Sequence, residues 1–245
     1  MQFQLEICCF NLQSALIAQH GGAHRVELCA DAGVGGTTQS FGIIKTAREK
    51  LQIQLYPIIR PRGGDFLFSN EEFEIMMTDV AFCKQIGCDG VVIGMLNEDG
   101  TIDKKRCAKL VQLAYPLGVT FHRAFDWSVN PQQALEDIID IGCERILTSG
   151  QQPTAIEGAE LIAQLIQQAN NRIIIMPGSG VRAANIIELA KKTSAQEFHT
   201  SARTHSLSNM QYINPSMKDD MSLIIPDENE IKNMIELLYN QSENI

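Results

Sequence analysis

Short apolar runs alternate along the whole chain with longer segments in which apolar residues recur at helical spacing. Eight runs stand out, and most are nearly continuous rather than strictly alternating. Continuous runs of this length are typical of parallel strands that helices cover on one face. The predicted strands span residues 4–10, 25–30, 54–61, 90–95, 119–125, 144–149, 172–176 and 197–202.

The segments between these runs carry signals for helix starts and stops. Four of them have a Ser, Thr, Asn or Asp followed three residues later by Glu or Gln, which is the spacing of a capping box. The capping residues are Ser69, Asn130, Thr154 and Asp227. Pro116 ends a helix that starts near Asp103, because the proline ring cannot continue the helical hydrogen bonds.

A short motif recurs just before three of the strands, at residues 22–26, 87–91 and 142–146. Each copy begins with a glycine that can end a helix in the left-handed conformation and ends on a β-branched residue. Eight such β/α units in 245 residues predict an α/β fold, a closed (β/α)8 TIM-type barrel, whose usual size is about 250 residues. A doubly wound open sheet is the alternative. No linker or low-complexity segment divides the chain, so we expect a single domain over residues 1–245.

Composition excludes several classes of partner. The chain has 20 Lys and Arg against 29 Asp and Glu, a net charge of -9, which argues against broad binding to nucleic acid or to anionic membranes. No apolar stretch approaches the roughly 20 residues that cross a bilayer. The first ten residues lack a basic start and include Glu6, so we expect no signal peptide and a cytoplasmic location. Seven cysteines in a reducing compartment are expected to be thiols.

Two of these cysteines differ from the rest in their position. Function in such barrels lies at the C-terminal ends of the strands, and the first two strands each end in Glu-x-Cys, as Glu6-x-Cys8 and Glu27-x-Cys29. Residues two apart share a face, and neighbouring strands are roughly 4.8 Å apart, so both thiols could meet in the barrel mouth. Such a pair suits Cu(I) better than calcium or magnesium. The alternative is two buried thiols in a packed interior.

Other strands also have polar side chains at their C-terminal ends. Burying these side chains would cost free energy unless they pair with one another or with a ligand, so they predict a polar pocket. Candidates for general acid/base work are His122, His199, Glu27 and Asp126.

Loops after strands seven and eight of such barrels often hold phosphate on backbone N–H groups. Residues 35–38 could form another backbone anion site, although each glycine turn could equally be a tight reversal. The chain has no Walker loop and no dinucleotide fingerprint, so we predict no organic cofactor. Anion-binding candidates are Arg60, Arg62, Arg123, Gly178, Gly180, Ser201 and Arg203.

Six motifs, in order along the chain, resemble the copper homeostasis protein CutC family. They lie at residues 25–29, 35–38, 59–66, 120–126, 144–150 and 197–203. The resemblance implies a cytoplasmic barrel protein linked to copper tolerance or trafficking, and a homo-oligomer, expected to be a dimer. Cys8 and Cys29 match the cysteine pair proposed to bind Cu(I) in that family.

The chain departs from the family pattern at two places. Gln39 replaces a usual proline, so we expect a looser loop. Residues 208–223 match poorly, including Ile213 where arginine is common, so we expect a different cap over the pocket mouth.

Three hypotheses follow from the sequence. The first is a copper-handling protein that binds Cu(I) through Cys8 and Cys29. The second is an enzyme acting on a phosphorylated or carboxylated small metabolite, with arginines on the anion and His122 or His199 as acid/base. The third is a noncatalytic barrel that acts through protein contacts. The expected ligand is therefore a copper ion or a small anion.

Overall fold

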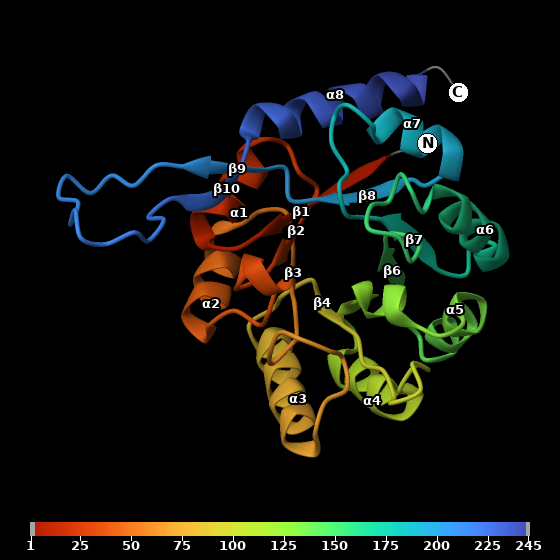
Figure 1. Ribbon diagram of the computed structural model, residues 1–245. Coiled ribbons are helices and arrows are strands. Elements are labelled where there is room, and N and C mark those ends of the chain that lie inside the picture. The colour runs from red at the N-terminus through yellow and green to blue at the C-terminus, as the bar shows by residue number, and fades with distance from the viewer. Residues whose placement is uncertain (1–2, 244–245) are drawn as a thin grey trace.

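Eight parallel strands form a ring that helices surround (Figure 1). This computed structural model describes residues 3–243, so residues 1–2 and 244–245 of the predicted 1–245 domain lie outside the described residues. All eight predicted strands are confirmed. They are β1 (Gln4–Cys9), β2 (Arg25–Leu28), β3 (Gln54–Pro57), β4 (Gly90–Ile93), β5 (Gly118–Phe121), β6 (Arg145–Thr148), β7 (Ile174–Pro177) and β8 (Glu197–Thr200).

Pairing between the strands identifies a TIM-type barrel rather than an open doubly wound sheet. The hydrogen-bonded orders are β3-β2-β1-β8 and β4-β5-β6-β7, all parallel. A parallel bridge between Ile58 and Val92 joins β3 to β4, and β7 lies beside β8 (Figure 1). The C-terminal ends of all eight strands therefore meet at one mouth.

Helices lie outside the ring and begin largely where the capping signals predict. Ser69 and Glu72 form a complete capping box, and Asn130 accepts a hydrogen bond from the Gln133 amide. Thr154 and Glu157 bond to each other's backbone, but the helix itself starts only at Ala159. The helices are α1 (Leu12–His20), α2 (Phe41–Lys50), α3 (Asn70–Gln85), α4 (Lys104–Ala114), α5 (Pro131–Asp140), α6 (Ala159–Ala169), α7 (Ile186–Thr193) and α8 (Glu228–Glu243), with short 3-10 turns η1 (Ala32–Val34) and η2 (Arg123–Trp127).

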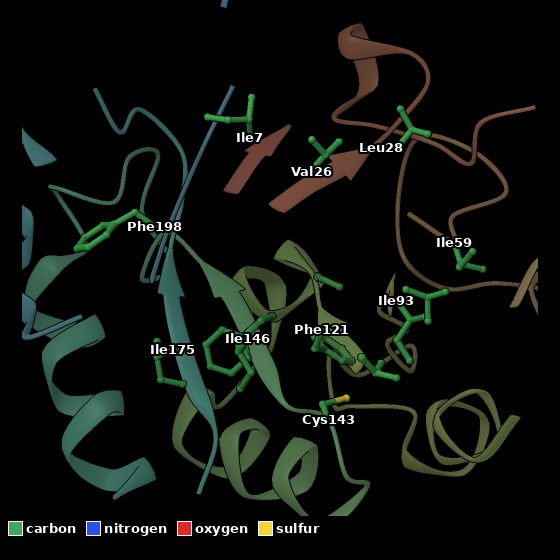
Figure 2. Close-up of a cluster of buried hydrophobic side chains, with 14 of the residues drawn as sticks. Ile7, Val26, Leu28, Ile59, Ile93, Phe121, Cys143, Ile146, Ile175 and Phe198 are labelled. Carbon is green, nitrogen blue, oxygen red and sulfur yellow. The ribbon is translucent and has the colours of Figure 1, made fainter. Parts of the chain in front are cut away.

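The main hydrophobic core lies between the barrel and the helices. Strand residues of one parity point outward into this layer, among them Ile7, Val26, Phe121, Ile146 and Phe198, which are fully buried (Figure 2). Burying one such side chain contributes about 1.5–3 kcal/mol. Because the outward positions supply this core, the inward positions can be polar.

Inward residues of β1, β2, β6 and β8 form a buried ionic network, defined here as Glu6, Arg25, Arg145 and Glu197. Arg25 pairs with Glu6 and lies 2.7 Å from Glu197, and Arg145 Nε lies 2.6 Å from the same Glu197 carboxylate. Each charge has an opposite charge beside it, which is the condition for burying it at tolerable cost. This network forms the floor beneath the mouth.

A hairpin that the sequence pattern did not predict follows β8. Strands β9 (Arg203–Ser206) and β10 (Leu223–Pro226) pair antiparallel, and residues 207–222 extend away from the barrel as an arm (Figure 1). Leu207 and Ile213 on this arm are 83% and 76% exposed. Among residues 3–243, no helix has the length and apolar character to cross a bilayer.

Candidate functional site

A cavity of about 260 Å³ opens at the barrel mouth, where the strand ends meet. Predicted site residues from six strand ends or the loops after them line it, including Cys8, Glu27, Arg60, His122 and His199. None of the described residues 207–222 lines it, so the arm does not form the expected cap.

Cys8 and Cys29 lie side by side, as the Glu-x-Cys spacing predicts. In the parallel register Cys8 is opposite Glu27, and the Cys29 amide donates to the Cys9 carbonyl at 2.8 Å, which holds the two strand ends together. The two sulfur atoms are 3.7 Å apart. With a carboxylate oxygen of Glu27 they form a thiol–carboxylate cluster (Cys8, Glu27 and Cys29) whose ligand atoms all lie within 4.8 Å of one another. Glu27, expected as an acid or base, thus lies in the candidate metal site.

His199 borders this cluster and is fixed from both sides. Its Nδ1 lies 2.7 Å from Glu6 and its Nε2 lies 3.7 Å from Glu27. Burial opposes a charge on His199, but hydrogen bonds to Cys8 and Glu6 and the nearby carboxylates outweigh it and raise its pKa well above the ordinary value. Burial likewise opposes charge on Glu6, but Arg25 and then His199 lower its pKa far below the ordinary value. The ionic network therefore holds a carboxylate that orients His199.

The protons of the thiol–carboxylate cluster are unevenly distributed. The hydrogen bond from Cys29, against the effect of burial, lowers the pKa of Cys8 to about 5, and His199 adds to the lowering. Burial, and then interactions with Cys8, raise the pKa of both Cys29 and Glu27 well above their usual values. The favoured arrangement of the two sulfurs at neutral pH is therefore a thiolate on Cys8 beside a thiol on Cys29. The thiolate is the form of cysteine that binds metals.

Arg60 reaches the mouth but is bound mostly to the backbone. Its Nη1 donates to the carbonyl oxygens of Val34 and Gly36, and its Nη2 donates to that of Gly64, each at 2.8 Å. The side chain is buried, no carboxylate among the described residues forms a salt bridge with it, and its Nε has no hydrogen-bond partner there. Arg60 is thus a buried cation without a counterion.

His122 is a second buried side chain with an unused nitrogen. It caps η2, because its Nδ1 accepts a hydrogen bond from the Ala124 amide at 3.1 Å. Gly94 makes room for the ring, since a Cβ there would lie 2.4 Å from it. Burial, and then Arg60, lower the pKa of His122 to about 3. The ring is neutral at pH 7 with its proton on Nε2, which has no partner among the described residues.

Asp126 and Arg123 mainly organise a loop. Asp126 accepts hydrogen bonds from the Ser149 and Gln151 amides at 3.0 and 3.2 Å and from Arg123 Nε at 2.7 Å, and it does not line the cavity. A carboxylate with its oxygens so occupied is poorly placed for acid/base work. Arg123 does line the cavity.

Arg62 lies away from the predicted anion pocket. Its guanidinium bonds to Glu72 and Asp65 at 2.6 and 2.9 Å, and Arg62 is not among the cavity-lining residues. The two arginines of the same turn therefore have different surroundings, because both follow the end of β3 at Pro57, beyond which the alternation of a strand no longer sets the direction of the side chains.

The residues predicted in the glycine turns and in the turn after β8 also differ in whether they line the cavity. Gly180, Ser201 and Arg203 line the cavity. The Gly178 amide is instead bonded to the Thr148 carbonyl at 2.9 Å, between β6 and β7. The predicted backbone anion site at residues 35–38 is not formed, because all four of its amides donate to backbone carbonyls.

Two residues that help to form the site were not predicted to do so from the sequence. Arg182 lines the cavity and donates to the Arg203 carbonyl at 3.1 Å; its only sequence signal is its place two residues after Gly180. Gln39 Nε2 donates to the carbonyl oxygens of Phe10 and Cys29 at 3.0 and 2.8 Å. Gln39 therefore ties its loop to the ends of β1 and β2, contrary to the expected loosening.

A family model matches most of the chain, over residues 3–204, and describes the CutC family. The chain belongs to the CutC family. The family model ends at residue 204, within β9, so it does not include the arm. A CutC protein of Xylella fastidiosa is 54% identical over 200 residues, covering 82% of this chain and 75% of that protein. The mouse copper homeostasis protein cutC homolog is 47% identical over 221 residues, covering 90% and 81%.

Solved structures agree with this membership. A crystal structure of CutC from Streptococcus agalactiae has a TM-score of 0.78 and 33% identity, covering 82% of this chain and 99% of that one. Phosphoribosyl anthranilate isomerase from Thermotoga maritima has a TM-score of 0.60 at 16% identity, over 98% of this CutC chain and all of that one. The second likeness concerns the barrel fold alone.

Proposed function

We propose that this CutC family member handles copper by binding Cu(I) through the thiols of Cys8 and Cys29. The observation that carries the proposal is the 3.7 Å separation of the two sulfurs, one of which, that of Cys8, belongs to a residue that lines the mouth cavity. With metal–sulfur bonds of roughly 2.3 Å, as zinc makes, one ion can reach two sulfurs as far apart as roughly 4.6 Å. The pair is therefore close enough to share one ion without movement of the strands.

The donor set favours a soft ion. Thiolates select Cu(I), whereas carboxylate and carbonyl oxygens suit magnesium and calcium. Cys8 supplies a thiolate because its pKa is lowered to about 5 by the hydrogen bond from Cys29 and, further, by His199. Cys29 must give up its proton when the ion binds, since metal ligands are deprotonated. Cys8 lines the cavity, so an ion can enter from the mouth.

An anaerobic Cu(I) titration against a competing chelator tests this proposal. We expect one ion per chain in the native protein and a loss of at least about 100-fold in affinity for the Cys8→Ser, Cys29→Ser double variant, because a neutral hydroxyl replaces each thiolate. Cys83→Ser, Cys88→Ser is the matched control, since those two thiols interact with each other away from the cavity. Equal affinity of the site variant and the native protein would refute the proposal.

The name of the mouse relative supports a role in copper homeostasis, and two further properties belong to the same proposal. We place the protein in the cytoplasm, supported by seven cysteines that are all free thiols. We also propose a homodimer, supported by the apolar side chains that the arm exposes, including Leu207, Tyr212 and Ile213.

A further inference from the structure

The cavity above the thiol–carboxylate cluster is strongly cationic. Four arginines line it, Arg60, Arg123, Arg182 and Arg203, against the Glu27 carboxyl group and the Cys8 thiolate. The chain as a whole carries 29 acidic and 20 basic side chains, so this excess is the reverse of the overall balance. A cleft of one sign in a protein of the other sign concentrates small ions of opposite charge.

Two nitrogens at this cavity have no partner among the described residues, Arg60 Nε and His122 Nε2. Each side chain is only 4% exposed and lines the cavity. Both nitrogens carry a proton: the guanidinium is always charged, and the Nδ1 of His122 is already an acceptor, which leaves the proton on Nε2. A buried donor without an acceptor costs about 1–3 kcal/mol, so native structures rarely keep one without a reason.

Phe66 lies against both side chains. Its ring centroid is 4.9 Å from Arg60 Cζ and 5.1 Å from the His122 ring, and Phe66 itself lines the cavity. It follows Gly63 and Gly64 in a surface loop, and Gly64 has a φ of 83°. The aromatic ring partly compensates the Arg60 charge, as cation–π contacts do, but it offers no acceptor in the plane of the N–H groups.

We propose that the mouth cavity binds a small organic oxyanion, a carboxylate or phosphate ester, whose oxygens accept hydrogen bonds from Arg60 Nε and His122 Nε2. Phe66 shifts outward to admit it, and Arg182 and Arg203 attract it at the rim. The volume of about 260 Å³ admits one small metabolite. This site goes beyond copper binding, and its two donor nitrogens are not ligands of the thiol–carboxylate cluster.

The test is a titration of the full chain with inorganic phosphate and, separately, with acetate, each against sodium chloride of equal ionic strength. Binding is followed by the NMR signal of the His122 Nε2 and by calorimetry. We expect saturable binding of at least one probe together with a shift of that signal. Phosphate alone would identify a phosphate ester as the ligand, and acetate alone a carboxylate. Saturation by neither probe, or binding without a shift at His122, would overturn the proposal.

Two substitutions at His122 separate its donor from its capping role. Asn is a good N-cap residue, so His122→Asn keeps an acceptor for the Ala124 amide but lacks a donor at the Nε2 position. His122→Gln carries an amide nitrogen that reaches farther out. We expect His122→Asn to weaken binding of the probe about 10-fold or more, and His122→Gln to restore part of it, since hydrogen bonds to charged groups are the stronger ones.

Rim and copper controls complete the design. Arg182→Gln should weaken binding several-fold, whereas Arg172→Gln, in an exposed pair with Glu136, should not change it. The Cys8→Ser, Cys29→Ser variant should still bind the anion, so a failure of the copper proposal and a failure of this one are distinguishable. Unchanged affinity of His122→Asn would contradict the assigned donors.

Discussion

His122 stays neutral in the barrel mouth because its surroundings penalise charge. Burial and the neighbouring Arg60 lower its pKa to about 3, whereas an exposed histidine titrates near 6.5. His122 therefore takes up a proton near pH 6.5 in the unfolded chain, but only at a much lower pH in the folded chain. Stability from this group is present above about pH 6.5 and is lost as the pH falls from there toward 3.

His122→Asn should flatten the dependence of stability on pH over this range. One proton taken up only by the unfolded chain changes the free energy of unfolding by about 1.4 kcal/mol per pH unit. Urea unfolding at about pH 7 and about pH 5 measures the difference between native protein and variant. The opposite contribution of His199 is present in both proteins and cancels. His205→Asn, which alters an exposed histidine on β9, is the control. Parallel pH curves for the native protein and His122→Asn would contradict the assignment.

The β9–β10 hairpin is joined to the barrel at its base, and its arm extends away from the barrel (Figure 1). Its arm exposes large apolar side chains, among them Leu207, Tyr212 and Ile213, each more than 70% exposed. Apolar groups gathered on one exposed segment mark an interaction surface. A second copy of the chain is the partner proposed above.

Polar substitution of the arm should therefore change the oligomeric state and leave the fold intact. We expect light scattering to give twice the chain mass of 27.2 kDa for the native protein and one chain mass for Leu207→Ser, Tyr212→Ser, Ile213→Ser. Circular dichroism should be unchanged, because these side chains lie outside the core. The same substitutions at exposed Ile75, Tyr115 and Tyr239 serve as the control. A native protein of one chain mass, or a dimer that survives the arm substitutions, would argue against this interface.

The molecule as a whole has two interiors with different physical bases. An apolar layer between strands and helices supplies the hydrophobic stabilisation, and the ionic network fills the barrel centre. The network also holds Glu6 under His199, so the floor and the mouth are one connected structure. Removal of one network member leaves an uncompensated charge in the interior.

Arg25→Met tests this connection. It leaves the carboxylates of Glu6 and Glu197 buried with one cation fewer, and breaking a buried pair in this way costs about 3–5 kcal/mol. Urea unfolding should show this loss, whereas Arg172→Met, which breaks an exposed pair, should stay near the native value. A loss no larger than that of the control would show that the network contributes little.

The sequence by itself determined the repeated β/α units and the parity of the strand residues. Apolar runs, capping residues and helix-ending glycines are local signals, because the spacing of apolar residues and the backbone conformation depend on neighbours along the chain. These signals predicted all eight strands, and they predicted that Cys8 and Cys29 lie close together. The sequence did not predict the arm, because its apolar residues follow neither the helical nor the strand spacing.

Only the tertiary structure decided which polar groups at the mouth are available. Arg62 finds a partner on α3 and Asp126 finds one just after β6, whereas Arg60 and His122 keep an unpartnered nitrogen. Arg182 enters the same cavity from another loop. The physical reason is that satisfying a hydrogen bond or a charge depends on atoms brought near by folding, often from more than 20 residues away along the chain.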